Sequence, residues 1–146
     1  MHPTINIPLQ HLVMVMWIYQ NEIFEDGDIG KHVGFVYLIT NKIDDRKYVG
    51  KKLFWFTKTK TLKGKKKKEK YISDWKTYWS SSEEVKDDVK RLGEENFTRE
   101  ILYLCDNKGT MSYLELREQI DRRVLENNNY YNAFVGGKIH KKHVKL

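Results

Sequence analysis

The chain has 146 residues, of which 40% are apolar and 32% charged, and its net charge is +7 with a pI near 9.3. This length suits one compact domain, and the apolar fraction is sufficient for a core. A single cysteine, Cys105, excludes an intrachain disulfide framework, and no stretch approaches the roughly 18 consecutive apolar residues of a transmembrane helix.

The first 33 residues are predicted to form an N-terminal extension. Residues 1–11 suggest a loose tail, and the apolar residues 12–19 indicate a strand or a buried segment. Residues 20–33 are rich in Asp, Glu and Gly, which indicates an exposed connection.

A β-hairpin is predicted next. Residues 34–40 are dense in β-branched and aromatic side chains, and a second short strand begins at residues 47–50. The polar residues 41–46 between them suit a turn, so the two strands should pair in antiparallel fashion.

The excess positive charge is concentrated in residues 51–70. This segment holds ten lysines and one glutamate, whereas the rest of the chain sums to −2. Lysine side chains spaced this closely repel one another unless water surrounds them or an anion binds to them. We therefore expect a mobile, low-complexity loop, densest at residues 65–68, that binds a polyanion. From charge alone, an ordinary basic soluble protein with a solvated loop remains an equal alternative.

A helix and a third strand should follow. Serines at positions 80–82 precede glutamates at the spacing of a capping box, for the pairs 80/83 and 81/84. This predicts a helix over residues 83–92 with Gly93 at its end. Residues 97–104 then indicate a strand.

A second helix is predicted from another capping box, formed by Ser112 and Glu115, to about Glu126. Its apolar stripe toward the core would be Tyr113, Leu116, Ile120 and Val124. Residues 130–135 suggest a short final strand. The elements together predict an α+β fold with a small antiparallel sheet of about three to four strands flanked by helices.

Two tyrosines lie eleven residues apart on the predicted hairpin, in Phe35-Val36-Tyr37 and Tyr48-Val49-Gly50. This pair resembles the tripeptides that name the GIY-YIG endonuclease family. The second tripeptide matches well, and the first has Phe35 where the family has glycine. The detail is most similar to phage homing endonucleases, which share the Ser81-Ser82 helix start.

The resemblance extends from about residue 34 to residue 132. It implies a nuclease domain over residues 34–135 with a basic insertion at 51–70, followed by a basic tail at 136–146. It further implies a Mg²⁺- or Mn²⁺-dependent endonuclease that hydrolyses phosphodiester bonds in double-stranded DNA. Such an enzyme would work in the cytoplasm, that of the host if a phage encodes it, and not at a membrane.

In this family a glutamate on the second helix is catalytic, and two glutamates compete for that position. Glu115 already has a predicted capping role and points away from the predicted apolar stripe. Glu118 lies on the flank of the helix, where it could border a site on the sheet. We therefore expect Glu118 to bind the metal, because Mg²⁺ accepts one or two carboxylates plus waters.

The resemblance also implies that Tyr37 and Tyr48 position or deprotonate the attacking water. A family arginine corresponds to Lys58 here, and Lys51 and Lys52 are the alternative cations. Asn132, in a Tyr-Asn pair, completes the expected catalytic set. The lysines expected to contact DNA are Lys51, Lys60, Lys63, Lys65, Lys66, Lys67, Lys68 and Lys70.

Two other functions remain open from the sequence. A non-catalytic nucleic-acid-binding module could use the lysine loop with flanking aromatic residues such as Trp55, Tyr71 and Trp75. A structural protein with a charged surface loop would explain the composition alone. A binding module has no chemical need for both tyrosines together with a catalytic glutamate, so the nuclease is the preferred hypothesis.

Overall fold

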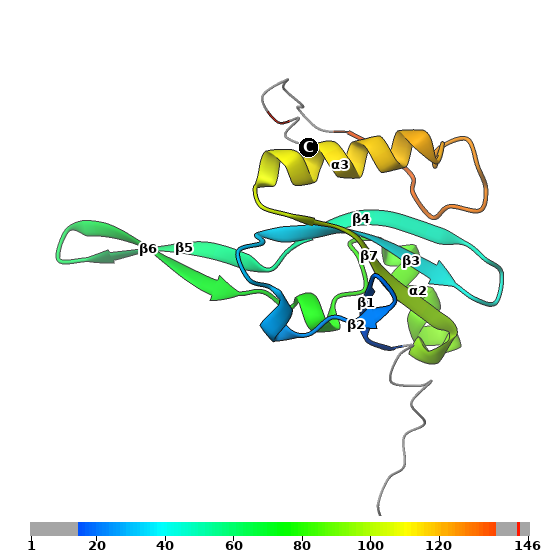
Figure 1. Cartoon of the computed structure of the whole chain (residues 1–146), viewed down its shortest axis with the longest axis horizontal. Coiled ribbons are helices and arrows are strands. Elements are labelled where there is room, and N and C mark those ends of the chain that lie inside the picture. Colours follow the sequence, from blue (N-terminus) through cyan, green and yellow to red (C-terminus); the bar gives the residue numbers. More distant parts are fainter. Residues whose placement is uncertain (1–14, 137–142, 144–146) are drawn as a thin grey trace, which may run out of the picture.

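The computed structural model describes residues 15–136 and residue 143, so residues 1–14 and most of the predicted basic tail lie outside it. Within the described residues the chain forms one sheet, a separate two-stranded ribbon and two α-helices (Figure 1). The strands are β1 (Trp17–Tyr19), β2 (Glu22–Ile23), β3 (Gly34–Asn41), β4 (Lys47–Leu53), β5 (Trp55–Leu62), β6 (Lys65–Ile72) and β7 (Phe97–Cys105). The helices are α2 (Glu83–Leu92) and α3 (Lys108–Asp121), with short 3-10 turns η1 (Asp26–Asp28), η2 (Trp75–Thr77) and η3 (Glu94–Asn96).

The main sheet has the strand order β2-β1-β7-β3-β4. β3 pairs antiparallel with β4 and β7, which confirms the predicted hairpin and third strand. β1 pairs parallel with β7, so the sheet is mixed rather than purely antiparallel. It has five strands because β1 and β2, from the predicted N-terminal extension, join its edge. β4 forms the opposite edge.

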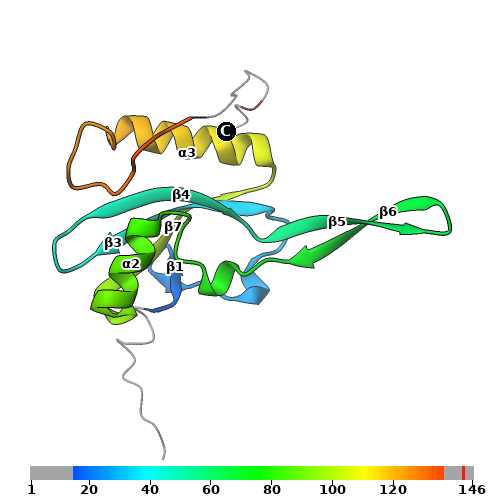
Figure 2. The ribbon, with the colours of Figure 1, turned by 180° about the vertical axis from the view of Figure 1, so that it is seen from behind.

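Helices cover both faces of this sheet. α3 lies on one face, and α2 lies on the other together with η2 (Figures 1 and 2). β3 is central and contributes side chains to both cores, because successive residues of a strand point to opposite faces. The core beneath α2 includes Phe35, Tyr37, Ile39, Val85 and Val89, and the core beneath α3 includes Val36, Leu38, Val49, Met111 and Leu114.

Helix α2 has the bounds that the sequence predicts, residues 83–92. Its N-cap is Ser82, whose hydroxyl accepts a hydrogen bond from the Val85 N–H, so the two predicted capping boxes are wrong. Gly93 ends the helix with φ of +95°, a conformation that glycine adopts without strain. The serine cluster therefore correctly marked the start of the helix.

The lysine-rich segment is an ordered β-ribbon, so the predicted mobile loop is wrong. β5 and β6 have eight residues each and pair antiparallel along their whole length. Lys63 and Gly64 both have positive φ and form the two-residue turn between them. Threonines alternate with lysines along β5 at positions 57–61, which is the period of a strand. The density of charge concealed this alternation.

Helix α3 starts earlier than predicted and turns a different face to the core. Its N-cap is Asn107, whose side chain accepts from the Thr110 N–H at 2.8 Å, so the predicted cap at Ser112 is wrong. The helix buries Met111 and Leu114, whereas Ile120 of the predicted stripe is 57% exposed. Apolar side chains occur on several sides of this helix, so the sequence alone does not show which side is buried. Packing against the sheet decides this.

The predicted final strand reduces to a single bridge between Tyr130 and Lys47 on the edge of β4. The chain over residues 130–136 thus runs beside β4 without extending the sheet. In the described part of the chain, none of the helices has the length and apolar character needed to cross a membrane.

Candidate active site

The free edge of β4 is where side chains from both covering layers meet. Tyr48 projects from β4, and its hydroxyl lies 3.2 Å from the Ser81 Oγ that precedes α2. A cavity of about 500 Å³ opens beside it, bordered by β4, the start of α2, α3 and residues 131–136. Its lining includes the hydroxyls of Tyr48 and Ser81, the ammonium of Lys51 and the carboxylates of Glu83, Glu84 and Glu115.

Burial raises the pKa of Tyr48, and the hydrogen bond with Ser81 acts in the opposite direction. The net result is a hydroxyl that stays protonated at neutral pH and borders the cavity. It can hold a water molecule by hydrogen bonding, but it needs a nearby cation before it can accept a proton.

Tyr37 lies beneath the cavity rather than in it. It faces Gly50 across the β3–β4 ladder and is 1% exposed. A Cβ at Gly50 would collide with the Tyr37 ring and hydroxyl, which explains the glycine that ends the second tripeptide. The Tyr37 ring centroid lies 6.2 Å from that of Tyr48 and 6.0 Å from that of Tyr78. Burial, with smaller contributions from Tyr78 and Tyr48, raises the pKa of Tyr37 well above its ordinary value.

Glu115 is the carboxylate that α3 brings to the cavity. Its side chain is only 15% exposed, and its Oε1 lies 4.0 Å from the Lys51 Nζ. Burial raises the pKa of Glu115, and Lys51 offsets this only in part. A partly desolvated carboxylate beside a lysine is poised to bind a cation or to accept a proton.

Glu118 points away from the tyrosines of the site. It accepts hydrogen bonds from the Tyr103 hydroxyl at 2.5 Å and from Arg122 Nε at 2.8 Å. Burial opposes its ionisation, but these two partners outweigh burial and hold its pKa below the ordinary value. The helical-wheel argument against Glu115 was therefore wrong, because α3 turns the Met111–Leu114 side to the sheet.

The structure separates the three lysines considered for catalysis. Lys51 lines the cavity, and its Nζ donates to Ser112 Oγ at 2.7 Å. Lys52, on the opposite face of β4, pairs with Asp74 at 2.6 Å. Lys58 lies on the ribbon, where its Nζ sits 5.3 Å from the centroid of the Tyr71 ring. The structure thus brings Lys51 to the cavity and places Lys52 and Lys58 outside its lining.

Asn132 is buried and bonded entirely to the backbone of β4. Its Oδ1 accepts from the Val49 N–H at 3.1 Å, and its Nδ2 donates to the Val49 carbonyl at 2.9 Å. Gln119 of α3 donates to the same carbonyl at 3.1 Å. These bonds satisfy the backbone N–H and carbonyl of Val49 at the free edge of β4. They thereby hold the preceding residue, Tyr48, at the cavity. Asn132 therefore positions the strand that carries the tyrosine.

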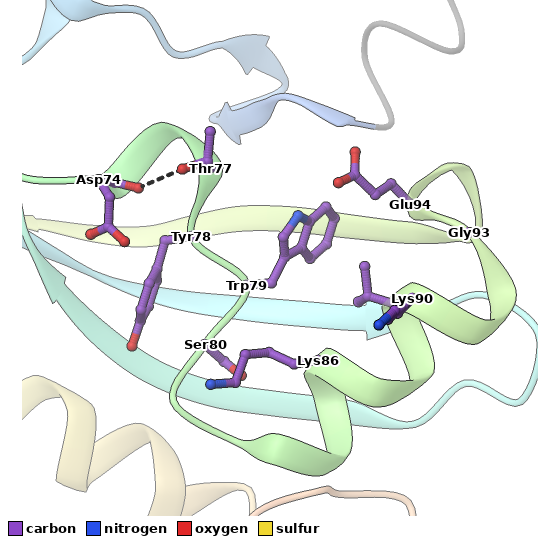
Figure 3. A pocket seen from close by; sticks show the side chains of 10 residues that line it. Asp74, Thr77, Tyr78, Trp79, Ser80, Lys86, Lys90, Gly93 and Glu94 are labelled. Carbon is purple, nitrogen blue, oxygen red and sulfur yellow. Dashed lines mark hydrogen bonds between the residues drawn. The ribbon is translucent and has the colours of Figure 1, made fainter.

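The segment between η2 and α2 forms the wall of the site on the α2 side. Its Tyr78 ring meets the Tyr37 ring edge-on, and the Lys52 Nζ lies 4.0 Å from the Tyr78 ring centroid. A second hollow of about 600 Å³ lies along this segment and is bordered by Trp79, Ser80 and α2. Figure 3 shows the side chains that line it. Tyr78 thus stands between this hollow and the tyrosine pair.

Arg99 of β7 anchors that wall from within the protein. Its Nη1 donates to the carbonyls of Lys76 and Tyr78, each at 2.9 Å, and its Nη2 donates to the Val15 carbonyl. The guanidinium also stacks on Trp79, with 4.2 Å to the ring centroid. Burial lowers the pKa of Arg99 to about 10. Arg99 therefore has a structural role in fixing the Tyr78 segment.

The carboxylate content of the site limits how it can hold a metal. Among residues 15–136 and 143, no group of three or more His, Cys, Asp or Glu side chains is arranged as a metal cage. Three carboxylates line the cavity: Glu115 from α3, and Glu83 and Glu84 from the start of α2. Glu83 is paired with Lys86 at 2.8 Å and Glu84 with Arg46 at 2.6 Å, so Glu115, 4.0 Å from Lys51, is the carboxylate left to bind a cation. A single carboxylate fits Mg²⁺, which keeps several waters and shares its coordination with substrate phosphates.

Sequence reasoning missed Gln119, set Glu115 aside in favour of Glu118, and offered Lys51 only as an alternative to Lys58. The alternation of a strand places Lys51 on the face of β4 opposite Tyr48. β4 is an edge strand, however, so side chains from both of its faces reach the same cavity. The local sequence does not show the order of strands in a sheet, so it does not show that β4 lies at the edge.

Comparison with known proteins gave one family match. The family model described as "Putative endonuclease segE, GIY-YIG domain" matches residues 17–135. The matched range includes β1, the ribbon, both helices and the segment that carries Asn132. The searches of curated proteins and of solved structures returned no match.

Proposed function

Because the chain belongs to the GIY-YIG endonuclease family, we propose that it is a metal-dependent endonuclease that hydrolyses phosphodiester bonds in double-stranded DNA. The family consists of nucleases, so the substrate is a nucleic acid. The choice of duplex DNA and the requirement for a divalent cation are our proposal.

One observation carries this proposal. Tyr48 from β4, Lys51 from the same strand and Glu115 from α3 border one cavity at the edge of the sheet. Hydrolysis of a phosphodiester needs an oriented water, positive charge near the phosphoryl oxygens and help for the leaving oxygen. The cavity offers a hydroxyl, an ammonium and a carboxylate for these tasks.

The side chains divide the work as follows. The neutral Tyr48 hydroxyl holds the attacking water, and Ser81 fixes the direction of that hydroxyl. The Lys51 ammonium, kept in place by Ser112, places positive charge where negative charge develops on the phosphoryl group. Tyr37 supports the Tyr48 ring from below and excludes water from the base of the site.

Glu115 is the residue that would hold the cation. When bound, Mg²⁺ supplies Lewis-acid stabilisation of the phosphoryl group and lowers the pKa of nearby water and hydroxyl groups. The partial burial of Glu115 favours this use, because a carboxylate with little water around it gains more from a cation.

A cleavage assay on supercoiled plasmid tests the proposal. The purified protein is incubated with Mg²⁺, with Mn²⁺ or with EDTA, and single-stranded DNA and duplex RNA serve as alternative substrates. We expect nicked or linear plasmid with either metal and none with EDTA. Binding without cleavage under every metal condition would instead support a non-catalytic nucleic-acid-binding module.

A further inference from the structure

The ribbon formed by β5 and β6 projects from one end of the molecule, well clear of both helices (Figures 1 and 2). Its base is fixed to the domain, because the Ser73 N–H donates to the Phe54 carbonyl at 2.7 Å and Phe54 is fully buried. Eight residues per strand give a length of roughly 26 Å. The ribbon is thus an arm with a defined origin.

The pairing register divides the ribbon into two faces of different chemistry. Residues directly opposite each other share a face. What we call the threonine face consists of Thr57, Thr59 and Thr61 with their partners Lys70, Lys68 and Lys66. The aromatic face consists of Phe56, Lys58 and Lys60 with their partners Tyr71, Glu69 and Lys67, followed by Leu62 and Lys65.

The aromatic face is partly occupied by contacts within the ribbon. Phe56 and Tyr71 stack at 5.7 Å, and the Lys58 Nζ lies over both rings. Lys60 forms an ion pair with Glu69 at 3.2 Å, and Glu69 also accepts from the Tyr71 hydroxyl. Part of the positive charge on this face is therefore neutralised within the ribbon.

All six residues of the threonine face are exposed, and none of them is acidic. Lys66 and Lys68 have no ion-pair or hydrogen-bond partner within the part of the chain that the structure describes, and Lys70 lies 5.6 Å from the Trp55 ring centroid. Its three lysines are about 7 Å apart along one strand, opposite a row of threonine hydroxyls. Such a face offers ammonium and hydroxyl groups to an external polyanion.

We propose that the ribbon lies in the major groove of duplex DNA with its threonine face toward the DNA. The inference rests on the proposed function, because it assigns the arm to the same substrate. The major groove is about 12 Å wide and admits a two-stranded ribbon, whereas the minor groove is about 6 Å wide. Lysines contact phosphates, and threonine presents a hydroxyl and a methyl group to base edges.

Two matched triple variants test which face is used. Lys66, Lys68 and Lys70 are changed to Gln on the threonine face, and Lys60, Lys65 and Lys67 are changed to Gln on the aromatic face. Both variants lose the same charge from the same ribbon, so a general electrostatic effect is equal in the two. Binding to a 30-base-pair duplex is measured in EDTA over a range of salt concentrations.

For the threonine-face variant we expect the slope of log K against log salt to flatten by about 2 to 3, since each phosphate contact contributes about 0.9. The aromatic-face variant should change the slope by less than about 1. Equal changes in both variants, or a larger change in the aromatic-face variant, would overturn the assignment of the face.

Dimethyl sulfate reactivity identifies the groove, because guanine N7 lies in the major groove and adenine N3 in the minor groove. We expect protection of guanine N7 that is lost only in the threonine-face variant, while its adenine N3 protection stays that of the wild type. Loss of adenine N3 protection instead would overturn the choice of groove. Wild-type protein that neither binds nor cuts DNA would refute the proposed function itself, which a failure of the face comparison does not.

Discussion

Replacement of Glu115 by Gln should abolish cleavage and at the same time stabilise the protein. Glutamine keeps the shape of the side chain but cannot offer a negative charge to a cation. The expected loss in cleavage rate is at least about 10²-fold, the scale for removing one group that stabilises a transition state. Lys51 keeps its hydrogen bond to Ser112, so the cavity should keep its shape.

The gain in stability follows from the pKa of Glu115. Burial raises this pKa above its ordinary value of 4.5, so the folded state disfavours the ionised carboxylate. We expect the Gln variant to be more stable than the wild type at neutral pH in the presence of EDTA, because an amide does not carry the cost of ionising a buried carboxylate. The gain should be absent below pH 4.5, where wild-type Glu115 is protonated in both states, and should appear as pH rises through the raised pKa.

Glu118→Gln provides a matched control on the same helix. The pKa of Glu118 is lowered, because its bonds to Tyr103 and Arg122 outweigh the effect of burial. The variant should cleave like the wild type and lose about 1 kcal/mol of stability at neutral pH. The loss should disappear as pH falls below 4.5 through the lowered pKa.

The two variants are compared by plasmid cleavage with Mg²⁺ and by urea unfolding in EDTA between pH 3 and pH 8. The structure predicts that only Glu115→Gln loses cleavage, and that the two variants change stability at neutral pH in opposite directions. A folded Glu118→Gln protein without activity, together with an active Glu115→Gln protein, would refute the assignment of Glu115. A Glu115→Gln protein that is less stable than the wild type at pH 7 would refute the argument from burial.

Three further expectations follow from the same contacts. Tyr48→Phe should reduce the cleavage rate by about 10²-fold, and Tyr37→Phe by less, because only the Tyr48 hydroxyl borders the cavity; equal rates in a single-turnover assay would contradict this order. Arg99→Met should lower the free energy of unfolding in urea by about 3 kcal/mol, since it leaves buried backbone carbonyls without donors, and an unchanged midpoint would contradict it. Burial raises the pKa of Cys105 to about 11, so a maleimide should label this thiol only after unfolding, and rapid labelling of native protein at pH 7.5 would show otherwise.

The local sequence was informative wherever one segment decides its own conformation. The hairpin of β3 and β4, the strand β7 and helix α2 have periods of two or 3.6 residues and clear turn or cap residues. The paired tyrosines were found in the same way, because their spacing reflects the length of one hairpin. These features depend on contacts between near neighbours in the chain.

In the ribbon, the high lysine content obscures the alternating pattern that indicates paired strands. Its lysines favour a solvated loop, while the alternating threonines and the Lys63-Gly64 turn favour paired strands. Exposed lysines on a two-stranded ribbon stay solvated on both faces, so charge and strand structure are compatible. The Lys63-Gly64 turn together with the alternating threonines predicts the hairpin when these features are given more weight than the composition.

The family, the tyrosine pair and the segment that concentrates positive charge could be recognised from the amino-acid sequence alone. Glu115 and Glu118 both lie on the side of α3 that meets the sheet, and the choice between them depended on which strand each one reaches: Glu115 lies at Lys51 of the edge strand β4, and Glu118 at Tyr103 of β7. The inclusion of Lys51 depended on β4 being an edge strand, because only at an edge do side chains from opposite faces share a cavity. Both outcomes arise from packing between elements far apart in the chain, where local periodicity carries no information.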